Sequence, residues 1–303
     1  METTVSLFCP VYQGKEYIGK CIDSLINQDF DLPYEIILCE FGSDEEVIEI
    51  CDNYENKYYG LVNVIHSDIN YGISASRNAG ICAARGKYVS FVDSDDCLQP
   101  DFLSKMYCFA EKGNFDIVTS GFYMYPHRRL FTSHHASYKG TGKKLITKFF
   151  LSKGCKYQVY CWGRLYKKTL LDDFKLRFPS YMPIYEDWPF FIETFVNAGK
   201  VGYLRKYLYH YIQNPSSATH IQRDSVFYNL KALKIARDYL FDHDPVLARK
   251  LFKKVTFSIR LHLLWDSIVC HKLYGKSIIA LYKEAKIKAE KIYQGKPIDY
   301  LPK

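Results

Sequence analysis

The sequence predicts an α/β fold with a mainly parallel central sheet and flanking helices, followed by a C-terminal helical region. Short apolar runs typical of buried strands alternate with segments of helical spacing over the first third of the chain. The connections between them are short and contain turn residues such as Gly and Asp. Strands that alternate with helices in this way pair in parallel and carry helices on both faces of the sheet.

The first third of the chain is expected to contain four strands and three helices. Residues 5–9 form an apolar strand, and Pro10 is expected to end it because proline has no N–H for the sheet ladder. Residues 17–27 carry their apolar side chains at helical spacing. The remaining elements expected here are a strand at 35–39, a helix at 45–54, a strand at 62–66, a helix at 74–84 and a strand at 88–92.

The rest of the chain is expected to be richer in helices. The polar segment 126–144 has no clear period and is predicted to be a loop. The other elements expected are helices at 102–110, 145–152, 165–173 and 186–198, a strand at 117–121, a strand or hairpin at 201–211, and a helical pattern from residue 225 onward.

The composition is that of a globular protein, with 48% hydrophobic and 24% charged residues among 303. The 27 Tyr and 20 Phe suit a core, a surface that binds sugar faces, or a membrane interface. We find no signal peptide and no apolar stretch of about 20 residues that would span a bilayer. The ten Cys form no CxxC pair, which favours reduced thiols in the cytoplasm.

The positive charge is concentrated at the end of the chain. Residues 225–303 hold 16 Lys and Arg against 7 Asp and Glu, whereas the remaining residues hold 25 basic and 26 acidic side chains. A basic helical region of this kind either lies on an anionic membrane surface or packs its apolar stripe on the preceding domain with its charges in solvent. No nucleic-acid-binding motif accompanies the charge, so a nucleic-acid partner is not expected.

The most informative stretch is the acidic run that follows the strand at 88–92. Asp93, Asp95 and Asp96 lie within four residues, at the edge of the sheet where open α/β folds bind ligands. Hard divalent cations prefer such oxygen ligands and are often shared between one or two carboxylates and substrate phosphates. The run therefore suggests metal-assisted chemistry on a nucleotide diphosphate, and the alternative is a solvated loop.

Several short motifs occur in an order that is more specific than any one of them. They are PVY at 10–12, CIDSLINQ at 21–28, EIIL at 35–38 with Gly42-Ser43, NYGISASRNAG at 70–80, FVDSDD at 91–96 and YEDW at 185–188. The series resembles the family 2 glycosyltransferases, whose fold is the Rossmann-like GT-A fold. The resemblance implies a GT-A domain at 1–215, with a nucleotide-sugar-binding half at 1–100 and an acceptor-binding and catalytic half at 101–215, before a basic helical region at 216–303.

The resemblance also implies which residues bind the donor, a nucleotide diphosphate sugar. Tyr12 would contact the base or ribose, or would be structural, and Arg77 would bind the nucleotide or its diphosphate, or would lie on the surface. The family usually has two Asp residues where this chain has Glu40-Phe41, so the donor nucleotide is left open. The implied donor-binding residues are Pro10, Val11, Tyr12, Glu40, Asn70, Arg77, Ser94 and Asp95.

A Mn²⁺ or Mg²⁺ ion is the cofactor that the resemblance implies. Asp95 would lie near the ribose and the metal, and Asp96 would be a direct ligand. Asp93 would support the loop. His210 would be a further ligand or, as is common for a lone His in an aromatic run, a structural residue.

Asp187 matches the general base of the family, which removes the proton from the acceptor hydroxyl in a single, inverting displacement. Glu186 and Trp188 would help bind the acceptor, and Trp162 would stack on a sugar or belong to the core. Without the resemblance, Glu186 and Asp187 would be read as residues that favour a helix N-terminus.

These features predict a metal-dependent, inverting hexosyl- or N-acetylhexosaminyltransferase that acts on a surface glycan or a lipid-linked oligosaccharide. We expect it in the cytoplasm, with contact to the inner face of the cell membrane as an additional option, and we leave the oligomeric state open. The alternatives are a transferase of a nucleotide-activated alditol phosphate and a noncatalytic protein that binds glycans or membranes.

Overall fold

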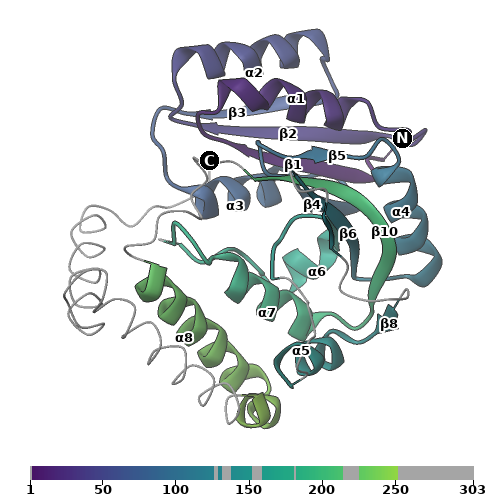
Figure 1. Cartoon of the computed structure of the whole chain (residues 1–303), viewed down its shortest axis with the longest axis vertical. Helices are drawn as coiled ribbons and strands as arrows, with labels where there is room; N and C mark the ends of the chain where they lie inside the picture. The colour runs from purple at the N-terminus through teal and green to yellow at the C-terminus, as the bar shows by residue number, and fades with distance from the viewer. Residues whose placement is uncertain are drawn as a thin grey trace.

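The computed structural model describes residues 2–125, 129–131, 138–151, 159–180, 182–213 and 225–251. Within them, ten strands form one sheet with helices on both faces (Figure 1). Its main path runs in the order β3-β2-β1-β4-β9-β6-β10-β5, while β7 pairs with β6 and β8 pairs with β10. This mixed α/β architecture confirms the predicted fold class.

The first part of the sheet is parallel, as predicted, because its strands alternate with helices. Strands β3, β2, β1 and β4 lie side by side and all pair in parallel. Their bounds and those of the intervening helices are β1 Val5–Val11, α1 Lys15–Ile26, β2 Tyr34–Phe41, α2 Glu45–Lys57, β3 Val62–Ser67, α3 Ile73–Ala83 and β4 Tyr88–Phe91.

The second part extends the sheet with mixed pairing. Strand β9 is antiparallel to β4 and to β6, β10 is parallel to β6, and β5 is antiparallel to β10. The elements are β5 Cys97–Leu98, α4 Phe102–Gly113, β6 Ile117–Tyr125, β7 Arg129–Phe131, β8 Tyr138–Gly140, α5 Gly142–Leu151, β9 Arg164–Lys167, α6 Lys168–Asp173, α7 Asp187–Asn197, β10 Val201–Ile212 and α8 Ser225–His243.

Pro10 does not end the first strand, which corrects the prediction. The Phe8 carbonyl accepts the Val92 N–H at 2.8 Å, so the backbone of Phe8 faces β4. The backbone of Pro10, two residues on, faces the same side. Because β4 ends at Phe91, the missing N–H of Pro10 costs no ladder bond, and β1 continues to Val11.

The prediction of a helix at 165–173 is wrong for its first residues, which belong to strand β9. The side chains of β9 alternate between the two faces of the sheet: Leu165 packs with the helices of one face and Tyr166 with those of the other. Pairing with β4 and β6, both distant in sequence, outweighs the local helical spacing. Residues 201–212 form one strand instead of a hairpin, and the predicted loop at 126–144 contains β7, β8 and the start of α5.

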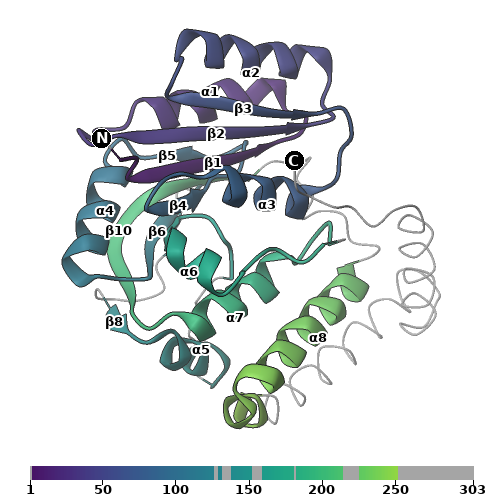
Figure 2. The same cartoon turned by 180° about the vertical axis from the view of Figure 1, so that it is seen from behind.

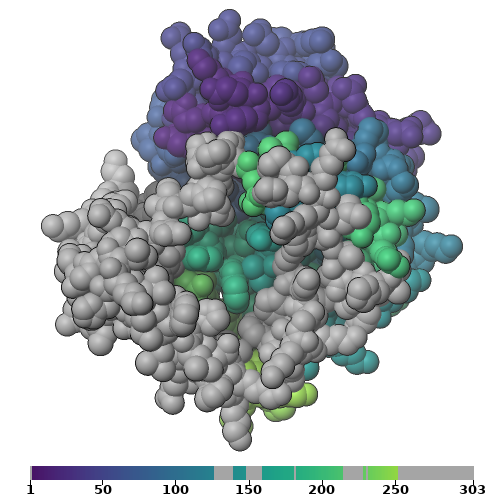
Figure 3. Space-filling model, in the orientation of Figure 1, coloured from purple at the N-terminus to yellow at the C-terminus, as the bar shows by residue number. Residues whose placement is uncertain are grey.

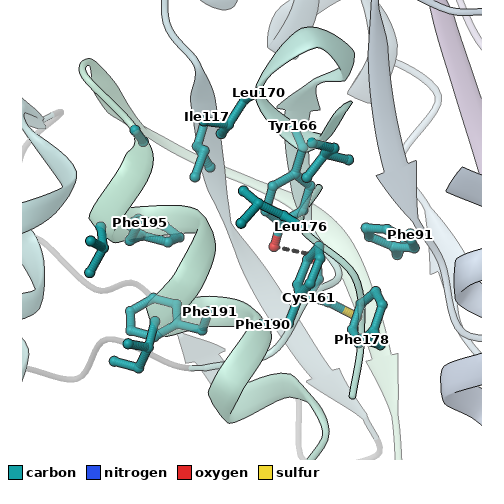
Figure 4. Packing of buried hydrophobic residues seen from close by; sticks show 14 of the residues in the cluster. Phe91, Ile117, Cys161, Tyr166, Leu170, Leu176, Phe178, Phe190, Phe191 and Phe195 are labelled. Atoms are coloured by element: carbon teal, nitrogen blue, oxygen red, sulfur yellow. Dashed lines mark hydrogen bonds between the residues drawn. The ribbon is translucent and has the colours of Figure 1, made fainter. Parts of the chain in front are cut away.

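Two hydrophobic cores cover the two faces of the sheet (Figure 2). Helices α1, α2 and α4 pack on one face, and α3, α5, α6, α7 and α8 contribute to the core on the other. The second core is rich in aromatic rings (Figure 4). In it, Phe178 stacks on Phe190 with ring centroids 3.9 Å apart, and Phe91 meets both rings edge to face.

The described part of the C-terminal region packs on helix α7. Leu240 of α8 and Leu247 and Leu251 beyond it are buried in the same core as α7. For these residues the structure supports the packing alternative. The predicted boundary between 215 and 216 and the basic residues after 251 lie outside the described residues. Among the helices that are described, none combines the length and the apolar character needed to cross a membrane.

Two helical glycines give opposite predictions for stability. A Cβ on Gly80 of α3 would overlap the Phe8 ring, whereas a Cβ on Gly19 of α1 would lie 3.6 Å from the Tyr54 hydroxyl, an ordinary contact. We expect Gly80→Ala to lower the free energy of unfolding by about 1–3 kcal/mol through overpacking. The matched Gly19→Ala should raise it by about 0.5–1 kcal/mol. Urea denaturation of both variants checks this, and equal effects would contradict the packing of α3 on β1.

Candidate active site

The candidate site lies where the loops after β1, β2, β3 and β4 meet, at the carboxyl edge of the parallel strands. These loops are tied together by short contacts. The Gln13 N–H donates to the Ser43 hydroxyl at 3.1 Å, and the Gly42 N–H donates to the Ser67 carbonyl at 2.8 Å. Gln13 has a φ of 57°, a left-handed conformation that is uncommon for a residue other than Gly. In Figure 3 the surface is hollowed between the N-terminal part and the green residues of the second half.

Arg77 lies at the centre of the site and contacts three carboxylates. Its Nη1 donates to Glu186 Oε1 at 2.5 Å and to Asp187 Oδ1 at 3.2 Å, and its Nη2 donates to Asp93 Oδ1 at 2.8 Å. The side chain is only 2% exposed. The guanidinium therefore faces three protein carboxylates, and its predicted contact with the donor stays a prediction.

The local sequence explains how so large a charged group becomes buried. Helix α3 is made largely of small residues, including Ser74, Ala75, Ser76 and Gly80, so it can pack closely on the sheet. Burial lowers the pKa of the Arg77 guanidinium, and the surrounding carboxylates outweigh that effect, so its pKa is raised overall. The Phe178 ring covers the guanidinium at 5.1 Å, and Nε is buried without a hydrogen-bond partner in the structure.

Glu186 and Asp187 sit at the start of α7. Tyr185 before them has a φ of 64°, so the chain turns sharply into the helix. Burial raises the pKa of both carboxyls, to about 7 for Glu186, while the positive charge of Arg77 opposes the rise. The side chain of Asp187 is 15% exposed, compared with 8% for Glu186. Asp187 is therefore the member of the pair that is more accessible to a substrate.

The acidic loop after β4 is fixed by strand β10. The Tyr209 hydroxyl donates to Asp96 Oδ2 at 2.5 Å, and the Ile212 N–H donates to Asp96 Oδ1 at 2.8 Å. The Asp93 N–H in turn donates to the Tyr209 hydroxyl oxygen at 3.2 Å. Asp96 is thus buried with both oxygens engaged. Asp95 is half-buried, and among the described residues no side chain donates a hydrogen bond to its carboxylate.

The acidic loop fits a divalent cation that is shared with a substrate. Burial and the negative charge of Asp93 raise the pKa of Asp95 to about 6, and burial raises that of Asp96. The described residues contain no group of three or more side chains arranged as a closed metal cage. Asp95 is the more accessible of the two carboxylates, because both oxygens of Asp96 already accept hydrogen bonds. A metal that also binds phosphates commonly uses only one or two protein carboxylates.

The predicted donor residues differ in how open they are. Pro10 and Val11 are buried in β1, whereas Tyr12 is 55% exposed at the end of that strand. Glu40 is buried, and its Oε1 accepts the Ser43 N–H at 2.6 Å. Its Oε2 lies 3.2 Å from His66 Nδ1. Glu40 therefore holds its own loop. Two further predicted donor residues are Asn70, whose Oδ1 accepts the Gly72 N–H at the start of α3, and Ser94, which is half-buried in the acidic loop.

Three predicted residues occupy aromatic surroundings. Trp162 is 6% exposed and stacks against Tyr160 and Tyr209, which favours the core alternative. The His210 Nε2 atom lies 2.5 Å from the side-chain nitrogen of Gln99. The His210 ring also stacks on Tyr125. It neighbours Tyr209 in the strand, so the two side chains point to opposite faces. Trp188 is half-buried in the first turn of α7.

Sequence reasoning missed two residues that shape the site, Tyr209 and Arg164. Tyr209 orders the acidic loop through its bonds with Asp93 and Asp96. Asp93, which was expected to support this loop, also joins it to Arg77. Arg164, buried in β9, donates to the Tyr160 carbonyl and to the Thr119 hydroxyl. The only sequence signal for Arg164 and Tyr209 was their place in aromatic runs, which does not reveal a polar partner more than 40 residues away.

Comparisons with known proteins point to one family. A model described as glycosyl transferase family 2 matches residues 6–174. The uncharacterized glycosyltransferase EpsJ of Bacillus subtilis (strain 168) is 34% identical over 224 residues, which are 72% of this chain and 63% of EpsJ, so the chain spans less than two thirds of that relative. The cholesterol galactosyltransferase of Borreliella burgdorferi is 28% identical over 294 residues, 92% of this chain and 80% of that protein.

A solved structure shows the same architecture. The poly(ribitol-phosphate) beta-N-acetylglucosaminyltransferase TarS of Staphylococcus aureus is 26% identical over 207 residues, 68% of this chain and 35% of TarS. The crystal structure of TarS residues 1–349 with UDP-GlcNAc matches with a TM-score of 0.74 at 20% identity, over 95% of this chain and 81% of that one. From the matched family model and this shared fold, we conclude that the chain belongs to glycosyl transferase family 2 and has the GT-A fold.

Proposed function

We propose that the protein is an inverting, metal-dependent glycosyltransferase in which Asp187 is the general base. The observation that carries the proposal is the position of Arg77, whose guanidinium contacts Asp187 at 3.2 Å and Asp93 at 2.8 Å. The side chain of Arg77 therefore contacts both the candidate base and the loop that would hold the donor. Family membership supports transfer of a glycosyl group, and the names of the relatives favour a hexosyl or N-acetylhexosaminyl group.

Asp187 suits the role of base because it is the more accessible of the two carboxylates. Burial raises its pKa, and the positive charge of Arg77 opposes that rise. Arg77 bonds Oδ1, so Oδ2 would accept the proton from the acceptor hydroxyl. The attacking oxygen would displace the nucleoside diphosphate from the opposite face of the anomeric carbon, which inverts its configuration.

Glu186 acts as a positioning residue in this proposal. It takes the shorter of the two Nη1 contacts, at 2.5 Å, and so fixes the guanidinium from the same turn that carries Asp187. An acceptor held beside Glu186 and Trp188 at the start of α7 would place its hydroxyl within reach of the base.

Asp95 and Asp96 would hold the metal, with Asp95 the more open of the two and Asp96 ordering the loop. A bound Mn²⁺ or Mg²⁺ would neutralise charge on the departing diphosphate. Tyr12 is the exposed aromatic side chain placed to meet the base or ribose. His210 joins this set only if its ring turns away from Gln99.

The acceptor proposed is a lipid-linked or surface glycan. The names of two relatives give one lipid acceptor, cholesterol, and one polymeric acceptor, poly(ribitol-phosphate). The cysteines that the structure describes are free thiols, in keeping with a cytoplasmic location at or near the inner face of the membrane. The excess of basic residues after 225 supports contact with an anionic surface.

Titration calorimetry tests the donor site directly. Uridine, guanosine, cytidine and thymidine diphosphates would each be titrated with and without Mn²⁺. We expect one of them to bind tightly only when Mn²⁺ is present, because the acidic loop repels a diphosphate unless a cation intervenes. Binding of none of the four, or equal binding without metal, would contradict the proposed donor site.

Substitution of the base separates catalysis from binding. Asp187→Asn keeps the size of the side chain and removes its ability to take a proton, so we expect transfer to fall by about 100-fold or more. The affinity for the nucleotide should change little, as calorimetry would show. The matched control Asp238→Asn, on the exposed side of α8, should keep full activity. Full transfer by Asp187→Asn would refute the role of base.

Transfer should also depend on pH. The base works only when ionised, and burial raises the pKa of Asp187. We therefore expect kcat/KM to fall at a higher pH than it would for an unperturbed Asp, which remains ionised to about pH 4. A rate that stays flat down to pH 5 would contradict a raised pKa at the base.

Loss of Arg77 should cost both stability and catalysis. Arg77→Met leaves three carboxylates near one another without their cation, so we expect about 3–5 kcal/mol of destabilisation in urea denaturation. The control Lys234→Met breaks an exposed ion pair with Asp238 on α8 and should cost no more than about 1 kcal/mol. In Arg77→Lys, which keeps one charge, the acid limb of the rate profile should move to higher pH. Similar stability losses in the two methionine variants would contradict the central role of Arg77.

A further inference from the structure

A stack of aromatic rings leads from the protein surface to the acidic loop. Tyr160 stacks on Trp162 with centroids 4.5 Å apart and planes 8° from parallel, and Trp162 stacks on Tyr209 at 4.4 Å and 12°. Tyr211 lies nearly parallel to Trp162 at 5.5 Å. Tyr209 is fully buried and Trp162 is 6% exposed, whereas Tyr160 is 37% exposed. Tyr160 is therefore more exposed than Trp162 and Tyr209, and Tyr211 beside them is half-buried.

The open ring of Tyr160 is held rigidly. Trp162 covers one face of the ring, and Phe122 meets its edge with centroids 6.4 Å apart. The backbone carbonyl of Tyr160 accepts a hydrogen bond from the buried Arg164 guanidinium, which is itself bonded to Thr119. A rigid ring loses little conformational entropy when a ligand stacks on it.

Tyr160 also lies close to the candidate base. It directly precedes Cys161, whose thiol hydrogen-bonds the Asp187 side chain. Burial, and after it the negative charge of Asp187, raises the pKa of the Tyr160 phenol. The acidic loop lies on the far side of Trp162, because that loop is bonded to Tyr209. Tyr160 is thus on the side of the site away from the donor loop and next to the residue that would deprotonate the acceptor.

We infer that Tyr160 is the platform on which a sugar ring of the acceptor stacks, with the attacking hydroxyl turned toward Asp187. The inference rests on the proposed function and adds the class of acceptor group, a pyranose with an apolar C–H face. Such a face complements an aromatic ring that is open on one side. Trp162, which the sequence suggested as a sugar contact, supports the platform from behind.

The test compares Tyr160→Ala with Tyr160→Phe, which keeps the ring. The probes are octyl β-D-glucopyranoside, octyl β-D-galactopyranoside and octyl N-acetyl-β-D-glucosaminide. Saturation-transfer NMR measures whether the sugar-ring protons of each probe contact the protein, and calorimetry measures binding of the nucleoside diphosphate with Mn²⁺. The exposed Tyr59, far from the site in the loop after α2, provides the control Tyr59→Ala.

The wild type, Tyr160→Phe and Tyr59→Ala should saturate the ring protons of at least one probe. Tyr160→Ala should weaken binding of that probe by about tenfold, which corresponds to about 1.4 kcal/mol. It should also raise the KM for transfer to that probe, while nucleotide binding stays within about twofold of the wild type.

Several results would overturn the platform role. They are equal saturation of the sugar by the wild type and Tyr160→Ala, saturation of the octyl chain alone, no contact with any probe in the wild type, or a loss of nucleotide affinity as large as the loss of probe affinity.

Failure of the proposed function would give a different result from failure of the platform role. It would appear as the absence of transfer and of metal-dependent nucleotide binding in the wild type, whatever the NMR signals show.

Discussion

The structure of the site depends on the buried ion-pair cluster around Arg77. This one guanidinium joins α3, the loop after β4 and the first turn of α7, three elements that are separated by up to 110 residues in sequence. A buried charge that loses its partners is costly, so these elements hold one another in place. The small residues of α3 make the arrangement possible because they let the helix approach the sheet with Arg77 beneath it. The packing of α3 on the sheet and the position of the candidate base therefore depend on the same contacts of Arg77.

The charge balance of the site also follows from this cluster. Arg77 contacts Asp93, Glu186 and Asp187, three carboxylates against one positive charge. Burial raises the pKa of Asp95 and of Glu186, and a neighbouring carboxylate raises each further. On the side of the acidic loop, a divalent cation and its bound diphosphate would complete the balance. On the side of α7, a carboxylate only partly stabilised by Arg77 keeps enough basicity to take a proton. The same shortage of positive charge thus suits both halves of the proposed reaction.

The sequence predicted the elements whose signals are local. Strands β1 to β4 and helices α1 to α3 were found because their apolar periodicity is continuous and their turns contain Gly or Asp. Strand β9 was missed because its pairing with β4 and β6 involves residues far away in the chain. The motifs located the acidic loop and Asp187, but nothing local to Arg77 indicates that it turns inward to three carboxylates. Likewise, no spacing rule links Tyr209 to Asp96, which lie 113 residues apart.

The way each part of the site is supported suggests where substrate choice resides. Asp187 begins a helix whose Phe190, Phe191 and Phe195 are buried in the core, and the acidic loop is clamped by Tyr209 and Ile212. These groups cannot shift without disturbing packed rings or buried hydrogen bonds. The residues with open surface at the site, Tyr12 at 55% and Tyr160 at 37% exposed, have no such constraint on their outer faces. In the proposed function these two residues would meet the donor and the acceptor, so we expect substitutions there to change substrate binding at little cost to the fold.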